Sequence, residues 1–206
     1  LIKDGNSTPY DGGGLRIQSS TVIITSCEIT SNTAEDRGGG IYITSSSTVY
    51  LVDTPVYSNT ATGSGLNGGD VYVTTNGKLY IARGGTVSSP SFTQYDEITH
   101  RDDGKVYKGC PKGSKGSVND VSETSFDSDH RADLTSGYTE DFPSDCTVCD
   151  GGSYSIGAAA SCTMCISSPG TGIYNSGEGE TDLHECTTPC PAGTYSDDWS
   201  GGCTVC

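Results

Sequence analysis

Gly38-Gly39-Gly40-Ile41 has two near-copies in this chain, Gly12-Gly13-Gly14-Leu15 before it and Gly68-Gly69-Asp70-Val71 after it. The first glycines of the three blocks are separated by 26 and 30 residues. This period is the length of one coil of a solenoid and is too short for an independent domain. The residues between the blocks repeat as well, because Ser31-Asn32-Thr33-Ala34 returns as Ser58-Asn59-Thr60-Ala61. The first half of the chain is therefore predicted to be a repeat structure.

Each repeat contains two short runs of alternating residues. In the run that follows the second glycine block, Ile41 and Ile43 are expected to face inward while Tyr42 faces outward. The residues expected inward are Leu15, Ile17, Ile41, Ile43, Val71 and Val73 in one run, and Val22, Ile24, Val49, Leu51, Leu79 and Ile81 in the other. Such short strands bury a core only when they stack on copies of themselves. The prediction is an all-β fold that begins with a short parallel β-helix of about three coils, each roughly 4.8 Å from the next.

Two stretches carry a resemblance to a known repeat. They are Ile29-Thr30-Ser31-Asn32 followed by Gly38-Gly39-Gly40-Ile41, and Val56-Tyr57-Ser58-Asn59 followed by Gly68-Gly69. The pattern resembles the repeat of chlamydial polymorphic outer membrane proteins, in which aromatic-x-x-Asn and Gly-Gly-Ala-Ile motifs alternate on a right-handed β-helix. Ile29 and Val56 stand where that family has Phe, and Gly40 and Asp70 stand where it has Ala. The resemblance covers roughly residues 1–90 and implies that the β-helix is right-handed.

Asparagines are expected to stack in a ladder of Asn6, Asn32 and Asn59. Asn6 lies six residues before Gly12, as Asn32 lies six residues before Gly38. Asn6 also begins Asn6-Ser7-Thr8, the one N-glycosylation sequon of the sequence, and is therefore a candidate glycosylation site. The two roles compete, because stacked asparagines bond to one another and would be shielded. By this count the chain starts within a coil, so we expect a β-helix truncated at its N-terminal end and a longer secreted chain.

The second half differs in composition. Nine of the ten cysteines lie between Cys110 and Cys206. Residues 110–206 carry 3 Lys/Arg against 15 Asp/Glu, a net charge of −12, while residues 1–109 carry 8 against 11, a net charge of −3. Many cysteines with few large apolar residues predict a loop-dominated fold held by disulfides in an oxidising compartment. The expected domains are the β-helix at 1–90, a cap or linker at 91–109 and an extended set of cysteine-rich repeats at 110–206.

Four close cysteine pairs suggest how these repeats are built. Taken alone, a pair such as Cys146-Thr-Val-Cys149 also fits a zinc knuckle or a redox motif. However, the second cysteine of a pair opens a loop with a tyrosine, and the first cysteine of the next pair closes it. The loops are expected at 110–146, 149–162, 165–186 and 190–203, with disulfides joining Cys110 to Cys146, Cys149 to Cys162, Cys165 to Cys186, and Cys190 to Cys203. Cys27 and Cys206 remain unpaired or pair externally, and spacing alone does not fix the connectivity.

The last loop carries the most specific motif in the chain. Cys190-Pro-Ala-Gly-Thr-Tyr195-Ser196, closed by Cys203-x-x-Cys206, resembles the ephrin-receptor-like and tumour-necrosis-factor-receptor-like cysteine-rich repeats. The long gap between Cys110 and Cys146 departs from the length usual in those families. The resemblance implies an extracellular rod or spacer, which in some members also binds a ligand.

Other side chains suggest surfaces and ligands. Outward tyrosines are expected to offer a contact surface or a stacking platform for sugars. These are Tyr42, Tyr72, Tyr50 and Tyr80. The acidic segment 120–145 holds low-ranking calcium candidates, Asp127, Asp129 and Asp133, but it fits no calcium-loop spacing, and a solvated acidic surface is the favoured interpretation. No other cofactor is expected. A net charge of −15 and a pI near 4.2 argue against nucleic acid and anionic membranes as partners, and no membrane-inserted segment is expected.

The sequence favours a non-enzymatic extracellular structural protein, a building block of a surface coat or of an extracellular filament of the flagellar-hair or glycoprotein-fibre type. Its expected partners are copies of itself, other extracellular structural proteins, and glycans. One alternative is an adhesin or receptor-like ectodomain that binds a cell-surface or glycan ligand. Another is a fragment of a β-helix polysaccharide-processing enzyme, for which Asp53 and Arg83 share one coil position. Such enzymes need several carboxylates close together, so an ordinary ion pair is the favoured interpretation of these two residues.

Overall fold

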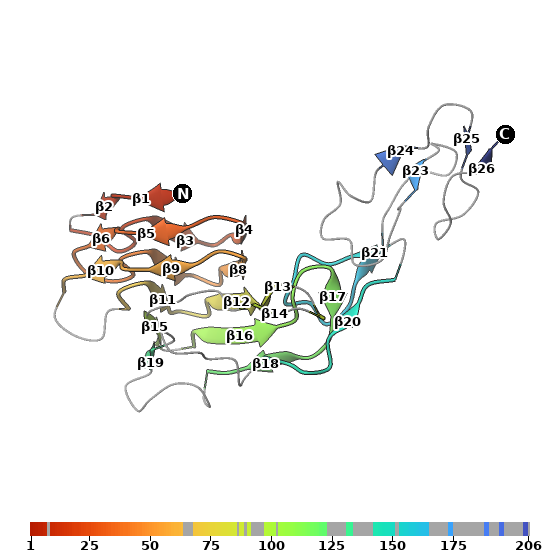
Figure 1. Cartoon of the computed structure of the whole chain (residues 1–206). Coiled ribbons are helices and arrows are strands. Elements are labelled where there is room, and N and C mark those ends of the chain that lie inside the picture. The colour runs from red at the N-terminus through yellow and green to blue at the C-terminus, as the bar shows by residue number, and fades with distance from the viewer. Residues whose placement is uncertain are drawn as a thin grey trace.

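The computed structural model describes most of residues 1–122 and parts of the remainder. The described residues are 1–7, 9–63, 68–85, 87–88, 90–91, 97–101, 103–122, 131–133, 142–150, 153–164, 173–174, 188–189, 194–195 and 204–205. Within them every regular element is a β-strand. Figure 1 shows a stack of coils that contains the N-terminus and, beside it, a second region that leads to the C-terminus.

Two sheets of parallel strands form the long walls of the stack. The first wall consists of β3 (Leu15–Gln18), β7 (Ile41–Thr44), β11 (Val71–Val73) and β15 (Glu97–His100). The second consists of β4 (Thr21–Thr25), β8 (Thr48–Val52), β12 (Lys78–Ala82) and β16 (Lys105–Gly109). The register is the one expected from the repeat, for example Ile41 opposite Val71 and Val49 opposite Leu79. The parallel β-solenoid of about three turns is confirmed.

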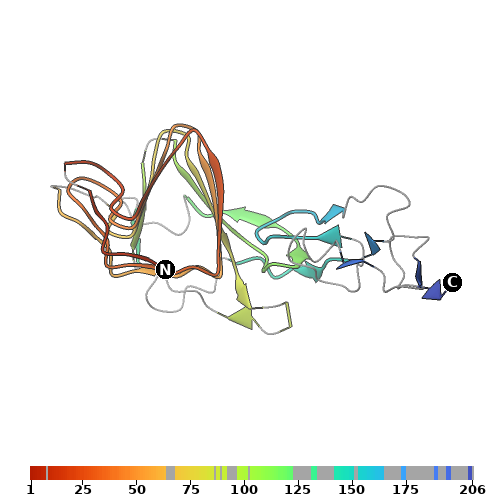
Figure 2. The same ribbon diagram turned by 90° about the horizontal axis from the view of Figure 1, so that it is seen from above.

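Two narrower sheets complete each coil. One is β1 (Ile2–Lys3), β5 (Ile29–Thr30) and β9 (Val56–Tyr57), and the other is β2 (Asn6–Ser7), β6 (Thr33–Ala34) and β10 (Thr60–Ala61). Seen along the stack in Figure 2, successive coils superimpose. We call β1–β4 the first coil, β5–β8 the second and β9–β12 the third.

The core fills the inside of the coils with the columns expected from the alternation. Ile41, Ile43, Val49, Leu51 and Leu79 are all 0 % exposed. In the first three coils each column consists of branched aliphatic side chains, such as Leu15, Ile41 and Val71, so a buried residue packs on its counterparts in the neighbouring coils. Burial of this kind contributes about 25 cal/mol for each Å² of apolar surface removed from water.

The end of the stack that lies nearest the cysteine-rich half is closed by antiparallel strands. β18 (Val118–Asp120) pairs antiparallel with β16, and β19 (Arg131–Asp133) pairs antiparallel with β15. Strands β15 and β16 lie in the segment expected to be a cap or linker. Because they add a further parallel strand to each wall, residues 97–100 and 105–109 continue the solenoid.

The cysteine-rich half repeats one small antiparallel unit. Its strand pairs are β17 (Ser114–Lys115) with β20 (Thr147–Val148), β21 (Ser153–Tyr154) with β22 (Thr163–Met164), β23 (Ile173–Tyr174) with β24 (Thr188–Pro189), and β25 (Thr194–Tyr195) with β26 (Thr204–Val205). In the last three pairs a tyrosine lies opposite a threonine, as Tyr154 lies opposite Thr163. One further antiparallel pair, β13 (Gly84–Gly85) with β14 (Pro90–Ser91), projects from the third coil.

Two disulfides hold the start of this half. The structure joins Cys110 to Cys146 and Cys149 to Cys162, which are two of the four expected pairs. Cys110 directly follows β16, so the first disulfide anchors the cysteine-rich half to the last parallel strand of the second wall. Ala158, from the turn between β21 and β22, packs against Val52 and Ala82 on the outside of that wall. The start of the cysteine-rich half is therefore fixed to the solenoid by the Cys110–Cys146 disulfide and by the apolar contact of Ala158.

Candidate interaction surfaces

The first coil has an open edge. In the part of the chain that the structure describes, β1–β4 pair with the second coil on one side and with no strand on the other. Leu15 and Val22 in this coil are only half-buried, whereas Ile41 and Val49 in the same columns are 0 % exposed. Leu1 is 68 % exposed. The edge thus offers backbone hydrogen-bonding groups and an uncovered end of the apolar core to another strand.

A ladder of buried amides runs through the coils beside the glycine blocks. Asn32 donates from its backbone nitrogen and from Nδ2 to Oδ1 of Asn59, at 3.0 and 2.9 Å. Asn59 makes the same two hydrogen bonds to Oδ1 of Asp70, at 2.9 and 2.8 Å. The other oxygen of Asp70 accepts from the backbone nitrogen of Glu97 at 2.9 Å. Because an ionised carboxylate only accepts hydrogen bonds, Asp70 ends the ladder at the third coil.

The ladder does not include Asn6, and this prediction from the sequence is wrong. The backbone nitrogen of Gly5 donates to Oδ1 of Asn32 at 2.9 Å, so Gly5 occupies the ladder position of the first coil. Asn6 lies opposite Thr33 on the neighbouring strand and is exposed.

Backbone angles identify the same register independently. The residue before each ladder position is left-handed, with φ of 57° at Asp4, 58° at Ser31 and 54° at Ser58. The error in counting arises because the turn between the ladder position and the glycine block varies in length. Seven residues separate Gly5 from Gly12, whereas six separate Asn32 from Gly38. Counting back six residues from Gly12 therefore stops one residue short of the ladder position, at Asn6 instead of Gly5.

The four expected contact tyrosines fall into two environments. Tyr42 and Tyr72 are 7 % and 4 % exposed and stack on each other with ring centroids 5.9 Å apart, so they are not available as a contact surface. Their outer faces meet arginines, with the Arg16 guanidinium 5.8 Å from the Tyr42 ring and that of Arg37 5.4 Å from the Tyr72 ring. The prediction that these two tyrosines form an exposed surface is corrected, because side chains outside the wall cover them.

Tyr50 and Tyr80 form a half-buried stack that continues to a third ring. Centroids are 4.8 Å apart between Tyr50 and Tyr80 and 4.6 Å apart between Tyr80 and Tyr107. The rings lie face to face, so their faces contact each other and chiefly their edges remain for other molecules. Burial raises the pKa of both Tyr80 and Tyr107. The hydroxyl groups of Tyr107 and Tyr50 and the carboxylate of Asp120 add to the rise at Tyr80, whereas at Tyr107 only Asp120 adds to it and Lys105 opposes it. A signal for Tyr107 was present in the sequence, since Lys105-Val106-Tyr107 repeats the spacing of Lys78-Leu79-Tyr80.

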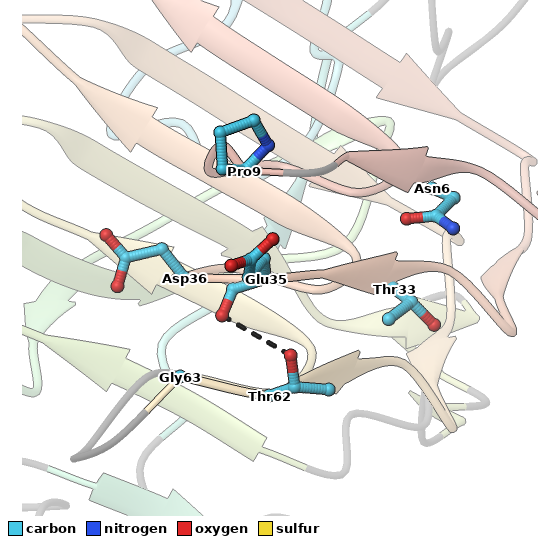
Figure 3. Close-up of a pocket in the computed structure, with 7 residues that line it drawn as sticks. All are labelled: Asn6, Pro9, Thr33, Glu35, Asp36, Thr62 and Gly63. Atoms are coloured by element: carbon cyan, nitrogen blue, oxygen red, sulfur yellow. Dashed lines mark hydrogen bonds between the residues drawn. The ribbon is translucent and has the colours of Figure 1, made fainter.

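A polar depression of about 630 Å³ lies beside the short sheet of β2, β6 and β10 (Figure 3). The residues that line it are Asn6, Pro9, Thr33, Glu35, Asp36, Thr62 and Gly63. They come from all three coils, and the Thr62 hydroxyl donates to the backbone carbonyl of Glu35 at 3.4 Å (Figure 3). Hydroxyl and carboxylate groups dominate the lining, which suits a polar ligand.

The remaining predicted residues are placed as follows. Cys27 is a free, half-buried cysteine, and its backbone nitrogen donates to the hydroxyl of Thr54 at 3.3 Å. Asp53 forms an ion pair with Lys112 at 3.0 Å. The predicted disulfides Cys165–Cys186 and Cys190–Cys203, together with Cys206, Asp127 and Asp129, lie outside the described residues, as does the side chain of Asp133. Within the described ranges no group of three or more His, Cys, Asp or Glu is arranged to hold a metal ion.

Asp120 is held at the closed end of the stack. Its Oδ1 accepts from the Ser122 backbone nitrogen at 3.0 Å, and its Oδ2 lies 3.7 Å from Nζ of Lys105. Burial opposes ionisation, but the hydrogen bonds from Ser122 and the charge on Lys105 outweigh it and hold the pKa of Asp120 below its ordinary value of 3.8.

Asp120→Asn is expected to lower the free energy of unfolding by less than about 1 kcal/mol at pH 7, because the ion pair is largely exposed. A lowered pKa stabilises the fold above the ordinary pKa, and this contribution is lost as the pH falls through the folded-state pKa. The difference between parent and variant should therefore be constant from about pH 7 to pH 5 and shrink as the pH falls below 3.8 toward about pH 2. Urea denaturation across this range measures it. Asp103→Asn, at an exposed turn, is the control, and a difference that persists at about pH 2 would contradict the prediction.

The architecture defines an all-β protein with a parallel β-solenoid followed by a disulfide-containing region. No family model matches this chain, and neither a curated protein nor a solved structure matches it either. The disulfides indicate an oxidising environment such as the cell exterior. Among the residues described, no helix has the length and apolar character needed to cross a membrane.

Proposed function

We propose that this chain is a non-enzymatic structural protein of the cell exterior, a building block of a surface coat or of an extracellular filament. The observation that carries the proposal is the open edge of the first coil. Among the described residues, the outer side of β1–β4 pairs with no other strand, and Leu15 and Val22 at that end of the core columns are only half-buried. Strand addition at such an edge is a favourable mode of association because it pairs the backbone and buries the apolar side chains in one step.

A second copy of the chain fits this edge, as does a preceding coil of a longer chain, and the following geometry concerns the second copy. The opposite end of the stack is closed by the antiparallel strands β18 and β19, so a copy cannot extend the parallel sheets there. Two open coils can instead meet head to head, where a two-fold axis makes facing strands antiparallel and uses the same patch on both chains. The cysteine-rich region then points away from the joint on each side and is left for other contacts. The resemblance of both halves to cell-surface repeats agrees with this role.

Electron microscopy of the protein, with image averaging, tests the proposal. The expected result is a regular assembly in which two solenoids abut at their first coils. Isolated monomers at every concentration would overturn the structural role and would favour the adhesin alternative.

Val22→Lys and Ile23→Lys form a matched pair for the same test. Both residues lie on β4, but Val22 is half-buried at the open end of the core, whereas Ile23 is 49 % exposed on the outer face. A lysine at position 22 must place its charge in the joint, so Val22→Lys is expected to abolish the assembly while Ile23→Lys retains it. Light scattering measures the mass, and circular dichroism establishes that each variant is folded. Equal assembly of the two folded variants would exclude the open coil as the joint.

A further inference from the structure

We propose that Asn6 carries an N-linked glycan whose first sugars lie in the depression beside β2, β6 and β10. Asn6 is the first residue of the sequon Asn6-Ser7-Thr8. A place in the asparagine ladder would have shielded Asn6 from modification. Gly5 holds that ladder position instead, and Asn6 is exposed. The disulfides indicate that the chain matures in an oxidising compartment, which is where such glycans are added in secreted proteins.

The modification transfers a preassembled oligosaccharide from a polyprenyl diphosphate carrier. The bond that forms joins Nδ2 of Asn6 to the anomeric carbon of the first sugar. The bond that breaks joins this carbon to the diphosphate oxygen, and the polyprenyl diphosphate leaves with the electron pair. Nδ2 gives up one proton to a base of the transferase, so no oxidant or reductant is required.

The depression has the chemistry to hold the first sugars. Asn6 is part of its lining, and Thr33 lies opposite Asn6 on the next strand. The hydroxyl groups of Thr33 and Thr62 and the carboxylate of Glu35 offer donors and acceptors to sugar hydroxyls, while Pro9 offers an apolar surface. Figure 3 shows these side chains along one flank of successive coils, so a glycan attached at Asn6 extends down that flank. It therefore leaves the open edge of the first coil accessible.

The full chain, secreted from a eukaryotic cell, tests the attachment. Intact mass and peptide mapping should show one glycan on Asn6 that a peptide N-glycosidase removes. Thr8→Ala destroys the sequon and is expected to abolish the added mass, whereas Ser7→Ala, the matched control, keeps the sequon and the glycan. An unmodified Asn6 in the folded, secreted chain would overturn the proposal.

The rate of glycan removal tests the position of the sugars. If they lie in the depression, the glycosidase should release the glycan several-fold more slowly from the native protein than from the denatured protein. Glu35→Gln, which removes an exposed carboxylate from the lining, should speed the native release several-fold, while the distant Asp103→Asn should leave it unchanged. Equal release from native and denatured protein would show that the glycan projects into solvent and does not occupy the depression.

Discussion

Asn59→Ala is expected to lower the free energy of unfolding by about 3–5 kcal/mol. The substitution removes the Oδ1 that accepts from the buried backbone N–H and from Nδ2 of Asn32, and Nδ2 of Asn32 keeps the carbonyls of Ile2 and Thr30 as acceptors. It also removes the Nδ2 that donates to Asp70 and to the carbonyls of Ile29 and Tyr57. Each buried group left unsatisfied costs about 1–3 kcal/mol. The loss is large because Asn59 is the middle of the ladder, so a single truncation breaks its contacts with Asn32 in the second coil and with Asp70 in its own coil.

Urea denaturation followed by circular dichroism measures the effect of Asn59→Ala. Thr60→Ala is the control, since it truncates an exposed side chain in the next position of the chain. Asp70→Ala should show a similar loss, because it removes the acceptor of the backbone N–H groups of Asn59 and Glu97 and one of the acceptors of Asn59 Nδ2. If both ladder variants unfold with the stability of Thr60→Ala, the ladder contributes nothing to the fold.

Replacing Cys110 and Cys146 together with alanine is expected to cost about 4 kcal/mol in unfolding free energy. The disulfide closes a segment with a sequence separation of 36, and the chain-entropy relation gives this value for a loop of that size. The effect should be concentrated at the boundary between the two halves, because Cys110 is 0 % exposed and directly follows the last parallel strand of its wall.

Denaturation and native-state hydrogen exchange together measure this second effect. Amides of β16 and of the neighbouring β17 should lose more protection than those of β7, which lies well inside the stack. Cys27→Ala provides the control, as the same change at a free cysteine closes no loop and should cost little. Uniform loss of protection through the stack would contradict a local role for the disulfide.

The interior of the solenoid was predictable because its physical cause is local and repeated. Alternation within each run decides which side chains point inward, and the repeat places equivalent residues of successive coils in one column. Ile41 and Val71 therefore pair as the sequence predicts. The disulfides Cys110–Cys146 and Cys149–Cys162 agree with the loops expected from the repeated cysteine pairs, although spacing alone did not fix this connectivity.

The surfaces were less predictable because they depend on what lies outside the repeat. Tyr42 and Tyr50 occupy equivalent outward positions of two walls, yet Tyr42 is buried and Tyr50 is half-exposed. The difference arises from the neighbours outside each wall, which include Arg16 against the Tyr42 ring. Alternation predicts the side of a strand that a residue occupies and carries no information about what covers that side.

By itself the sequence determined that this protein is a short parallel β-solenoid followed by a disulfide-rich region, because period, alternation and cysteine spacing are properties of the chain. The tertiary structure decided how long the solenoid is, which residues form the ladder, and which side chains are accessible. Residues 97–100 and 105–109 became strands because a further layer of backbone groups pairs with β11 and β12. Asn6 became exposed because one additional residue in a turn moves it out of the ladder register. The hydrogen bonds between neighbouring coils fix the register of each residue, and the sequence of one coil does not specify those bonds.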